Sequence, residues 1–183
     1  MTRIPALARD EMDDEGKRVY DETVAATGRV GRGPAVGYAH APGMWETNNS
    51  ATEYFENRCS LTLPQLRLVA LLVARRWNAA YPWAAQARMA LEAGLDRAVV
   101  DAVNARERPG FANREDEVVH DAARELLATG TLGADGFAAA EEVLGYRRLA
   151  DLVGVIGHFC KTAMMANVVD AEAPAEWPSH LAD

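Results

Sequence analysis

The stretch LPQLRLVALLVARRWNAAYPWAAQARMALEAGLDRAVVDAV, which runs from Leu63 to Val103, decides the fold class of this chain. Its first half repeats large apolar residues every three or four positions, the spacing of one face of an α-helix, and Pro64 suits the first turn of that helix. Period-2 alternation, the mark of a half-buried strand, is not evident in the chain. The sequence therefore predicts an all-α fold of six to eight helices.

Two later segments carry the same helical spacing. A stripe that begins at Val118 is closed by Gly130, and the longest helix is predicted over residues 146–168. Gly154 and Gly157 lie inside that long helix, where each costs about 1 kcal/mol relative to alanine. We expect both glycines to serve close helix–helix packing, either within the fold or across a subunit interface.

The remaining segments are expected to lie outside the main helices. Residues 28–43 are rich in glycine and proline and predict a loop with at most one short helical turn. The tail, residues 169–183, should be extended and poorly ordered unless Trp177 docks. We find no linker, so residues 1–183 are expected to form a single domain.

Composition and charge exclude several classes of function. The chain has 183 residues and a net charge of −8 with no strong Lys/Arg cluster, which disfavours nucleic acid as a partner. We see neither a signal peptide nor a stretch apolar enough to span a bilayer, so a cytoplasmic protein without membrane contact is expected. Cys59 and Cys160 are expected to be buried free thiols. A small molecule or another protein chain remains as the partner.

Two histidines are candidate chemical groups. Glu117 and His120 form a Glu-x-x-His pair, but a di-iron bundle needs a second copy, which is missing, so a solvated pair on the polar side of its helix is predicted. No metal and no cofactor are predicted. His158 lies among apolar residues of the longest helix, where its pKa could stay near neutrality. It is either a hydrogen-bonded core residue or a general acid/base that contacts a ligand.

Three arginines lie close in sequence to the segment Asn78–Gln86, NAAYPWAAQ. They are Arg75, Arg76 and Arg88. The planar fork of a guanidinium binds both oxygens of a carboxylate, so any of the three could anchor a small organic acid, although surface arginines are common and each one taken alone is more often an ordinary surface residue.

The 63–103 segment resembles the core of the carboxymuconolactone decarboxylase family, whose relatives include the alkylhydroperoxidase D-like proteins. The decarboxylase-like branch often reads Trp-Asn-x-x-Tyr-Glu-Trp-x-x-His before an Ala-Gly-Leu turn; the matching residues here are Trp77, Asn78, Tyr81, Trp83 and Ala93-Gly94-Leu95. The segment LGYRRLADLVGVIGHFCKTAMMANV resembles the closing helix of the family. The resemblance covers most of residues 34–168. It implies an alkylhydroperoxidase D-like helical bundle that assembles as a homo-oligomer, a trimer or hexamer, with a pocket near the motif helix.

The motif departs from the family at its chemical positions. Pro82 stands where the branch has glutamate, and Gln86 stands where it has histidine. The peroxidase branch would also place cysteines at Ala79 and Pro82. Neither the acid/base nor the thiol mechanism can be transferred to these positions. Proline disfavours a helix interior, so the motif helix should either begin late, with Tyr81 near its cap and Pro82 in its first turn, or be kinked there.

Two functional hypotheses follow. In the first, the protein is a decarboxylase-like enzyme on a small organic acid or lactone: Tyr81 and Gln86 bind the substrate, Trp77 and Trp83 line the cleft, an arginine anchors the carboxylate and His158 moves protons. The reaction could be decarboxylation, isomerisation or ring closure. In the second, it is a catalytically silent oligomer that binds a ligand. Peroxidase activity is disfavoured because both cysteines lie outside the motif.

Overall fold

The computed structural model describes residues 2–28 and 30–182 and is entirely helical over that part of the chain. Those residues form eight α-helices and one 3-10 turn, so the predicted all-α class is confirmed. The elements are η1 (Arg9–Glu11), α1 (Asp14–Thr27), α2 (Pro34–Tyr38), α3 (Pro42–Asn57), α4 (Leu63–Arg76), α5 (Ala80–Glu92), α6 (Arg97–Asn104), α7 (Arg114–Thr129) and α8 (Ala134–Val169).

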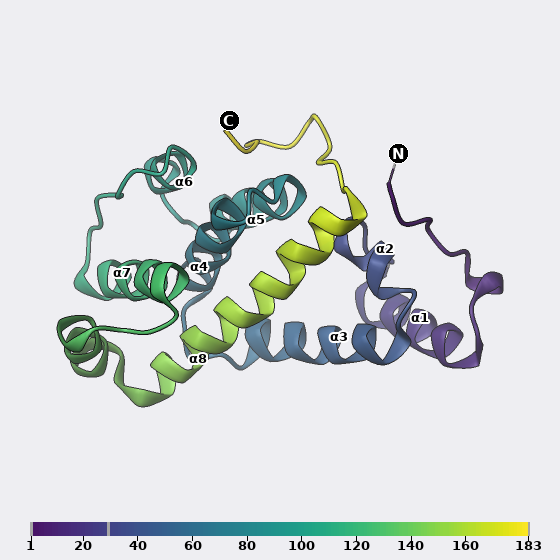
Figure 1. Ribbon diagram of the computed structural model, residues 1–183, viewed down its shortest axis with the longest axis horizontal. Helices are drawn as coiled ribbons and strands as arrows, with labels where there is room; N and C mark the ends of the chain where they lie inside the picture. Colours follow the sequence, from purple (N-terminus) through teal and green to yellow (C-terminus); the bar gives the residue numbers. More distant parts are fainter. Residues whose placement is uncertain (1, 29, 183) are drawn as a thin grey trace.

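Helix α8 organises the molecule. It runs diagonally across the view, with α1, α2 and α3 on one side and α4 to α7 on the other (Figure 1), and it packs against α2, α3, α4, α5 and α7. Gly145 breaks it with φ 67° and ψ 171°, so the second part corresponds to the helix predicted over residues 146–168. The inner face of α8 includes Leu152, Val155 and Phe159, all buried.

Helix α4 lies in the centre of the core. Every residue from Gln65 to Arg75 is buried. Thr62 caps its N-terminus by accepting a hydrogen bond from the Gln65 amide, while the Gln65 side chain accepts one from the Thr62 amide, and Pro64 lies in the first turn as predicted. Helix α7 likewise ends at Gly130, which is in the left-handed conformation that favours glycine.

The junction between α4 and α5 confirms the prediction made from Pro82. Asn78 takes a left-handed backbone conformation with φ 47°, Ala79 is the N-cap and α5 begins at Ala80. Pro82 is therefore in the first turn, with Tyr81 beside the cap. The first-turn amides have no partner within a helix, so the missing N–H of proline costs no hydrogen bond there.

The two glycines of the long helix differ in their surroundings. A Cβ on Gly154 would lie 3.2 Å from the Phe55 ring, so this glycine permits close packing of α3 on α8. A Cβ on Gly157 would meet nothing within 4 Å. By length and composition α8 could cross a bilayer, contrary to the sequence expectation, but the core helix of a helical bundle passes the same test.

The C-terminal tail docks on the bundle through Trp177, the condition under which an ordered tail was expected. The Trp177 ring lies 5.4 Å from that of Tyr81 between centroids. Ser179 accepts a hydrogen bond from the indole of Trp83 at 3.2 Å, and Asn104 bonds the tail backbone at His180. The tail thus crosses above α5 toward α6 (Figure 1).

Candidate functional site

A cavity of about 320 Å³ lies between α1, α2, α3, α5 and α8. Gln86 from α5 and His158 from α8 both line it, although they are far apart in the sequence. Three polar atoms in its wall, the hydroxyl oxygen of Tyr38, Oδ1 of Asn48 and Nδ1 of His158, are buried without a hydrogen-bond partner in the described part of the chain. Buried polar atoms are normally paired, so these three mark a place for a ligand or water. The other polar side chains of the wall are Thr23, Thr27, Asn49, Thr52, Glu56 and Thr162.

His158 is held between aromatic rings. Its ring centroid lies 5.3 Å from that of Phe55 and 5.2 Å from that of Phe159, and its Nε2 is 3.4 Å from the Thr52 hydroxyl. Burial, with a smaller contribution from the charge of Lys161, lowers the pKa of His158 to about 4. The expectation of a pKa near neutrality was therefore wrong: at pH 7 this imidazole is neutral.

Behind Gln86 lies a buried arginine that the sequence analysis did not single out. Arg67 of α4 is 3% exposed, forms an ion pair with Glu56 and donates to Oε1 of Gln86 at 3.2 Å. The carbonyl of Gln86 is thus engaged, and its amide nitrogen is the atom that can donate to a ligand. A charged residue between Leu66 and Leu68, inside an apolar stripe, was the signal that could have identified Arg67.

The aromatic candidates lie elsewhere. The ring of Tyr81 packs on Gly33 and on Trp177. A Cβ added to Gly33 would lie 2.4 Å from the Tyr81 ring. Trp83 is fully buried in the core. Trp77 is 40% exposed and its indole nitrogen lies 3.3 Å from Sγ of Cys160. These three aromatic residues are not part of the wall of the His158 cavity.

The three predicted arginines also lie outside that cavity. Arg88 pairs with Glu92 at 2.7 Å and stacks over the ring of Trp177 at 5.6 Å. Arg75 and Arg76 line a second cavity, which is formed by α4, α6 and α7. The structure therefore brings together Gln86 and His158 and separates them from the other candidates.

The Glu-x-x-His pair does not form the solvated unit that was predicted. Glu117 is ion-paired with Arg108 and Arg114, as a surface carboxylate would be. His120 is fully buried, packs against Phe111 and has its Nδ1 2.8 Å from Asp121. This part of the prediction was wrong because His120 faces the core side of α7, where Val119 and Ala123 are also buried.

The two thiols are free and half-buried, and neither lines the His158 cavity. Burial raises the pKa of Cys59, so its thiol form is favoured. Among residues 2–28 and 30–182 there is no group of three His, Cys, Asp or Glu side chains arranged to hold a metal ion.

Comparisons with known proteins bear on the fold. No protein-family model matches the sequence, and no curated protein matches it significantly. Among solved structures, an uncharacterised peroxidase-related protein with an alkylhydroperoxidase AhpD core from Ralstonia eutropha JMP134 superposes with a TM-score of 0.76 at 17% identity, covering 96% of this chain and 93% of its own.

Two further structures give similar values. A peroxidase-related protein from Silicibacter sp. TM1040 has a TM-score of 0.75 at 16% identity, covering 98% of this chain and 94% of its own. A cysteine-to-alanine variant of the debrominase Bmp8, in complex with 2,3,4-tribromopyrrole, has a TM-score of 0.74 at 12% identity, covering 96% and 93%. At such identities the likeness shows the fold, which is alkylhydroperoxidase D-like, and no more.

Proposed function

We propose that this protein, which has the alkylhydroperoxidase D-like fold, acts on a small organic acid or lactone in the cavity that Gln86 and His158 share. The observation that carries the proposal is that three polar atoms in the wall of one cavity have no hydrogen-bond partner among the described residues: the hydroxyl oxygen of Tyr38, Oδ1 of Asn48 and Nδ1 of His158. Its volume of about 320 Å³ suits a small ligand. The reaction class is decarboxylase-like or isomerase-like, in keeping with the family resemblance of the motif helix.

In this proposal His158 is the group that moves the proton. Its pKa of about 4 makes it a weak base while the cavity holds no negative charge. A ligand carboxylate close to the ring favours the imidazolium and raises that pKa toward neutrality. The ring can then accept a proton from a substrate carbon and return it to another atom, while the Gln86 amide donates to a ligand oxygen.

A second candidate, a catalytically silent ligand-binding protein, is favoured by one observation. The positions that carry titratable residues in the family carry Pro82 and Gln86 here, and the carbonyl of Gln86 is already bonded to Arg67. A cavity wall that carries Gln86 in place of a titratable residue can orient a ligand without changing it.

The test starts from a panel of small carboxylic acids and γ-lactones, followed by NMR for binding and for product. The proposed enzyme should lose about 10²-fold or more in turnover on His158→Gln while it still binds its substrate. His180→Gln, the same change on the exposed tail, is the matched control. Binding without turnover in the native protein would support the silent protein instead. No binding of any member to the native protein would count against both candidates.

We also propose that the protein is a homo-oligomer, a trimer or hexamer by the family resemblance. Exposed apolar side chains support a subunit contact along α8: Val153 is 52% exposed, Met164 45% and Val168 57%. Light scattering at micromolar concentration should give a mass above that of one chain, and a monomer would refute the proposal.

A further inference from the structure

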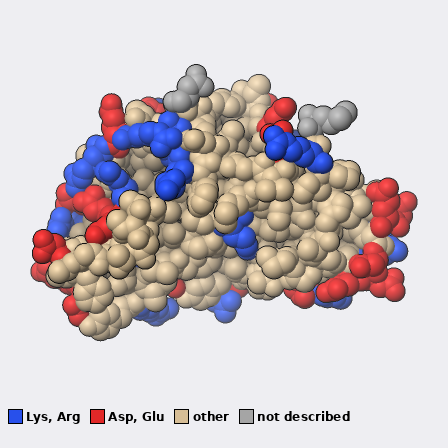
Figure 2. All heavy atoms as spheres, viewed as in Figure 1, with Lys and Arg blue, Asp and Glu red and all other residues tan. Residues whose placement is uncertain are grey.

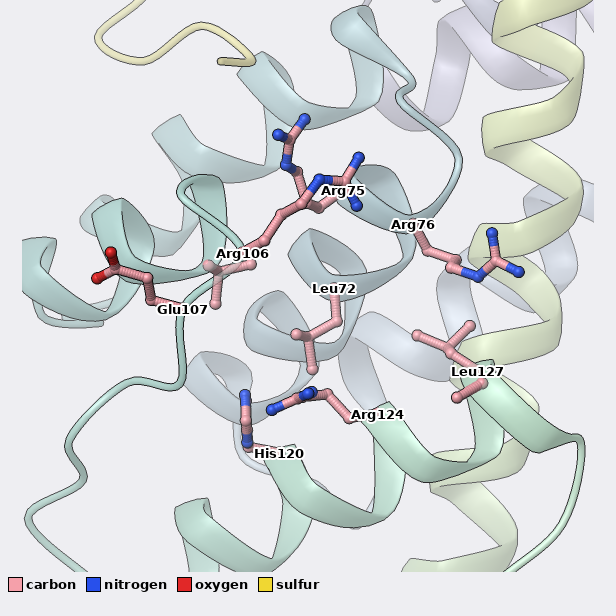
Figure 3. Close-up of a pocket in the computed structure, with 10 residues that line it drawn as sticks. Leu72, Arg75, Arg76, Arg106, Glu107, His120, Arg124 and Leu127 are labelled. Carbon is pink, nitrogen blue, oxygen red and sulfur yellow. The ribbon is translucent and has the colours of Figure 1, made fainter. Parts of the chain in front are cut away.

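The second cavity, between α4, α6 and α7, is unusual in its charge. It has a volume of about 220 Å³, and its wall contains four arginines, Arg75, Arg76, Arg106 and Arg124, with Glu107 as the acidic residue. Lys and Arg side chains gather at the end of the molecule where α6 lies (Figure 2), although the chain as a whole has a net charge of −8. The side chain of Glu107 points away from the arginines (Figure 3).

Two of these arginines are held close together. Arg75 and Arg106 both donate to Oδ1 of Asn78, at 3.3 Å and 2.8 Å. Burial lowers the pKa of Arg75, and the nearby charge of Arg106 lowers it further because the two cations repel each other. The left-handed backbone of Asn78 presents its amide oxygen to both guanidinium groups at the end of α4. The neutral amide oxygen accepts from both groups, and Arg75 also donates to the backbone carbonyl of Ala182 at 2.9 Å.

Three of the four cations lack an ion-pair partner in the described part of the chain. Within residues 2–28 and 30–182, Arg76, Arg106 and Arg124 form no ion pair. All three are exposed, so the cavity is open to solvent above its buried floor. Guanidinium groups that line an open cavity and have no carboxylate partner can bind an oxyanion.

The floor of the cavity contains a buried polar atom that points to a ligand. His120 is 0% exposed, and its Nε2 has no hydrogen-bond partner among the described residues. Its Nδ1 donates to the Asp121 carboxylate at 2.8 Å. Burial lowers the pKa of His120, so in the empty cavity the ring is neutral and Nε2 is an acceptor. A dianion bound beside the ring favours the imidazolium, whose Nε2–H can then donate to it. Arg124, one turn further along α7, turns toward His120 (Figure 3).

We propose that this cavity is a binding site for a small dianion, a phosphate or dicarboxylate group, which the arginines clamp while Nε2 of His120 bonds the group at the floor. The ligand must be small, because the volume is below the roughly 300–1,000 Å³ of pockets for drug-sized molecules. The site is separate from the His158 cavity, and neither the sequence motif nor the proposed reaction uses it.

The experiment titrates the full-length protein with inorganic phosphate, and in a parallel arm with succinate, by calorimetry at low ionic strength. The tighter of the two identifies the ligand class. Arg106→Gln and Arg124→Gln, both at exposed positions, should each weaken binding about tenfold or more, the expected loss of one charge-assisted hydrogen bond. Arg97→Gln removes the same charge from α6 outside the cavity and should leave binding within twofold.

A second measurement follows His120 directly. Its imidazole ¹H–¹⁵N NMR signals should shift on addition of the bound anion, and those of His158 should stay unchanged. Three results would overturn the proposal: no binding of either anion, equal weakening by Arg97→Gln, or His120 signals that do not respond.

Discussion

The ion pair between Glu56 and Arg67 lies behind Gln86 in the wall of the His158 cavity, and the substitution Glu56→Gln tests how much this pair stabilises the fold. Arg67 is 3% exposed and Glu56 29% exposed at their side chains, and the other partner of the guanidinium is the neutral oxygen of Gln86 at 3.2 Å. Removing one partner of a fully buried pair costs about 3–5 kcal/mol, whereas exposed pairs contribute about 0–1 kcal/mol. Because Glu56 is partly exposed, we expect a loss of about 2–3 kcal/mol in the free energy of unfolding.

The assay is urea unfolding followed by circular dichroism, with thermal unfolding in parallel. For a chain of this size a loss of that magnitude lowers Tm by about 5–10 °C. Glu53→Gln is the matched control: it makes the same change on α3, in an ion pair with Arg58 whose side chains are 62% and 53% exposed. That control should cost less than about 1 kcal/mol.

The double variant Glu56→Gln, Arg67→Met completes a thermodynamic cycle. An apolar side chain of similar length needs no counter-charge, so the double variant should recover much of the loss seen in Glu56→Gln. The reasoning is refuted if Glu56→Gln and Glu53→Gln differ by less than about 0.5 kcal/mol.

Three further outcomes are expected. The folded state lowers the pKa of His158 to about 4 from an ordinary value of 6.5. The contribution of the neutral ring to the free energy of unfolding is therefore complete above about pH 6.5 and is lost as pH falls toward 4. Allowing for solvent screening the loss is about 1–2 kcal/mol, and unfolding of His158→Gln should not show it. Gly145→Ala should destabilise the fold by about 1–3 kcal/mol, because φ is 67° at this position although no atom lies near a new Cβ. Gly157→Ala is equally open but helical, so it should stabilise a monomer by up to about 1 kcal/mol. Urea unfolding compares the two variants, and equal effects would contradict the strain at Gly145. Any turnover found should persist in the Cys59→Ser, Cys160→Ser double variant, and peroxide consumption abolished by these changes would place the chemistry at a thiol.

Much of the fold was predictable because its determinants are local. The apolar spacing from Leu66 to Trp77, the position of Pro64 and the stop at Gly130 each act within a few residues, and helices follow these signals whatever packs against them. The late start of α5 also followed from a local rule, since Pro82 is tolerated only in a first turn. Gln86 became a candidate through the resemblance of the motif helix to a known family, whereas His158 was a candidate because it lies among apolar residues of the longest predicted helix.

The surroundings of the polar side chains were decided by tertiary structure alone. Helical spacing tells which residues share a face, but a cavity forms where faces of distant helices fail to fill the space between them, and its volume and charge depend on all of them. The sequence could therefore name His158 without its low pKa, and Arg75 and Arg76 without the partners that α6 and α7 bring to them. Burial of Arg67 and His120 has the same cause, because each became an interior group only when other helices covered its face.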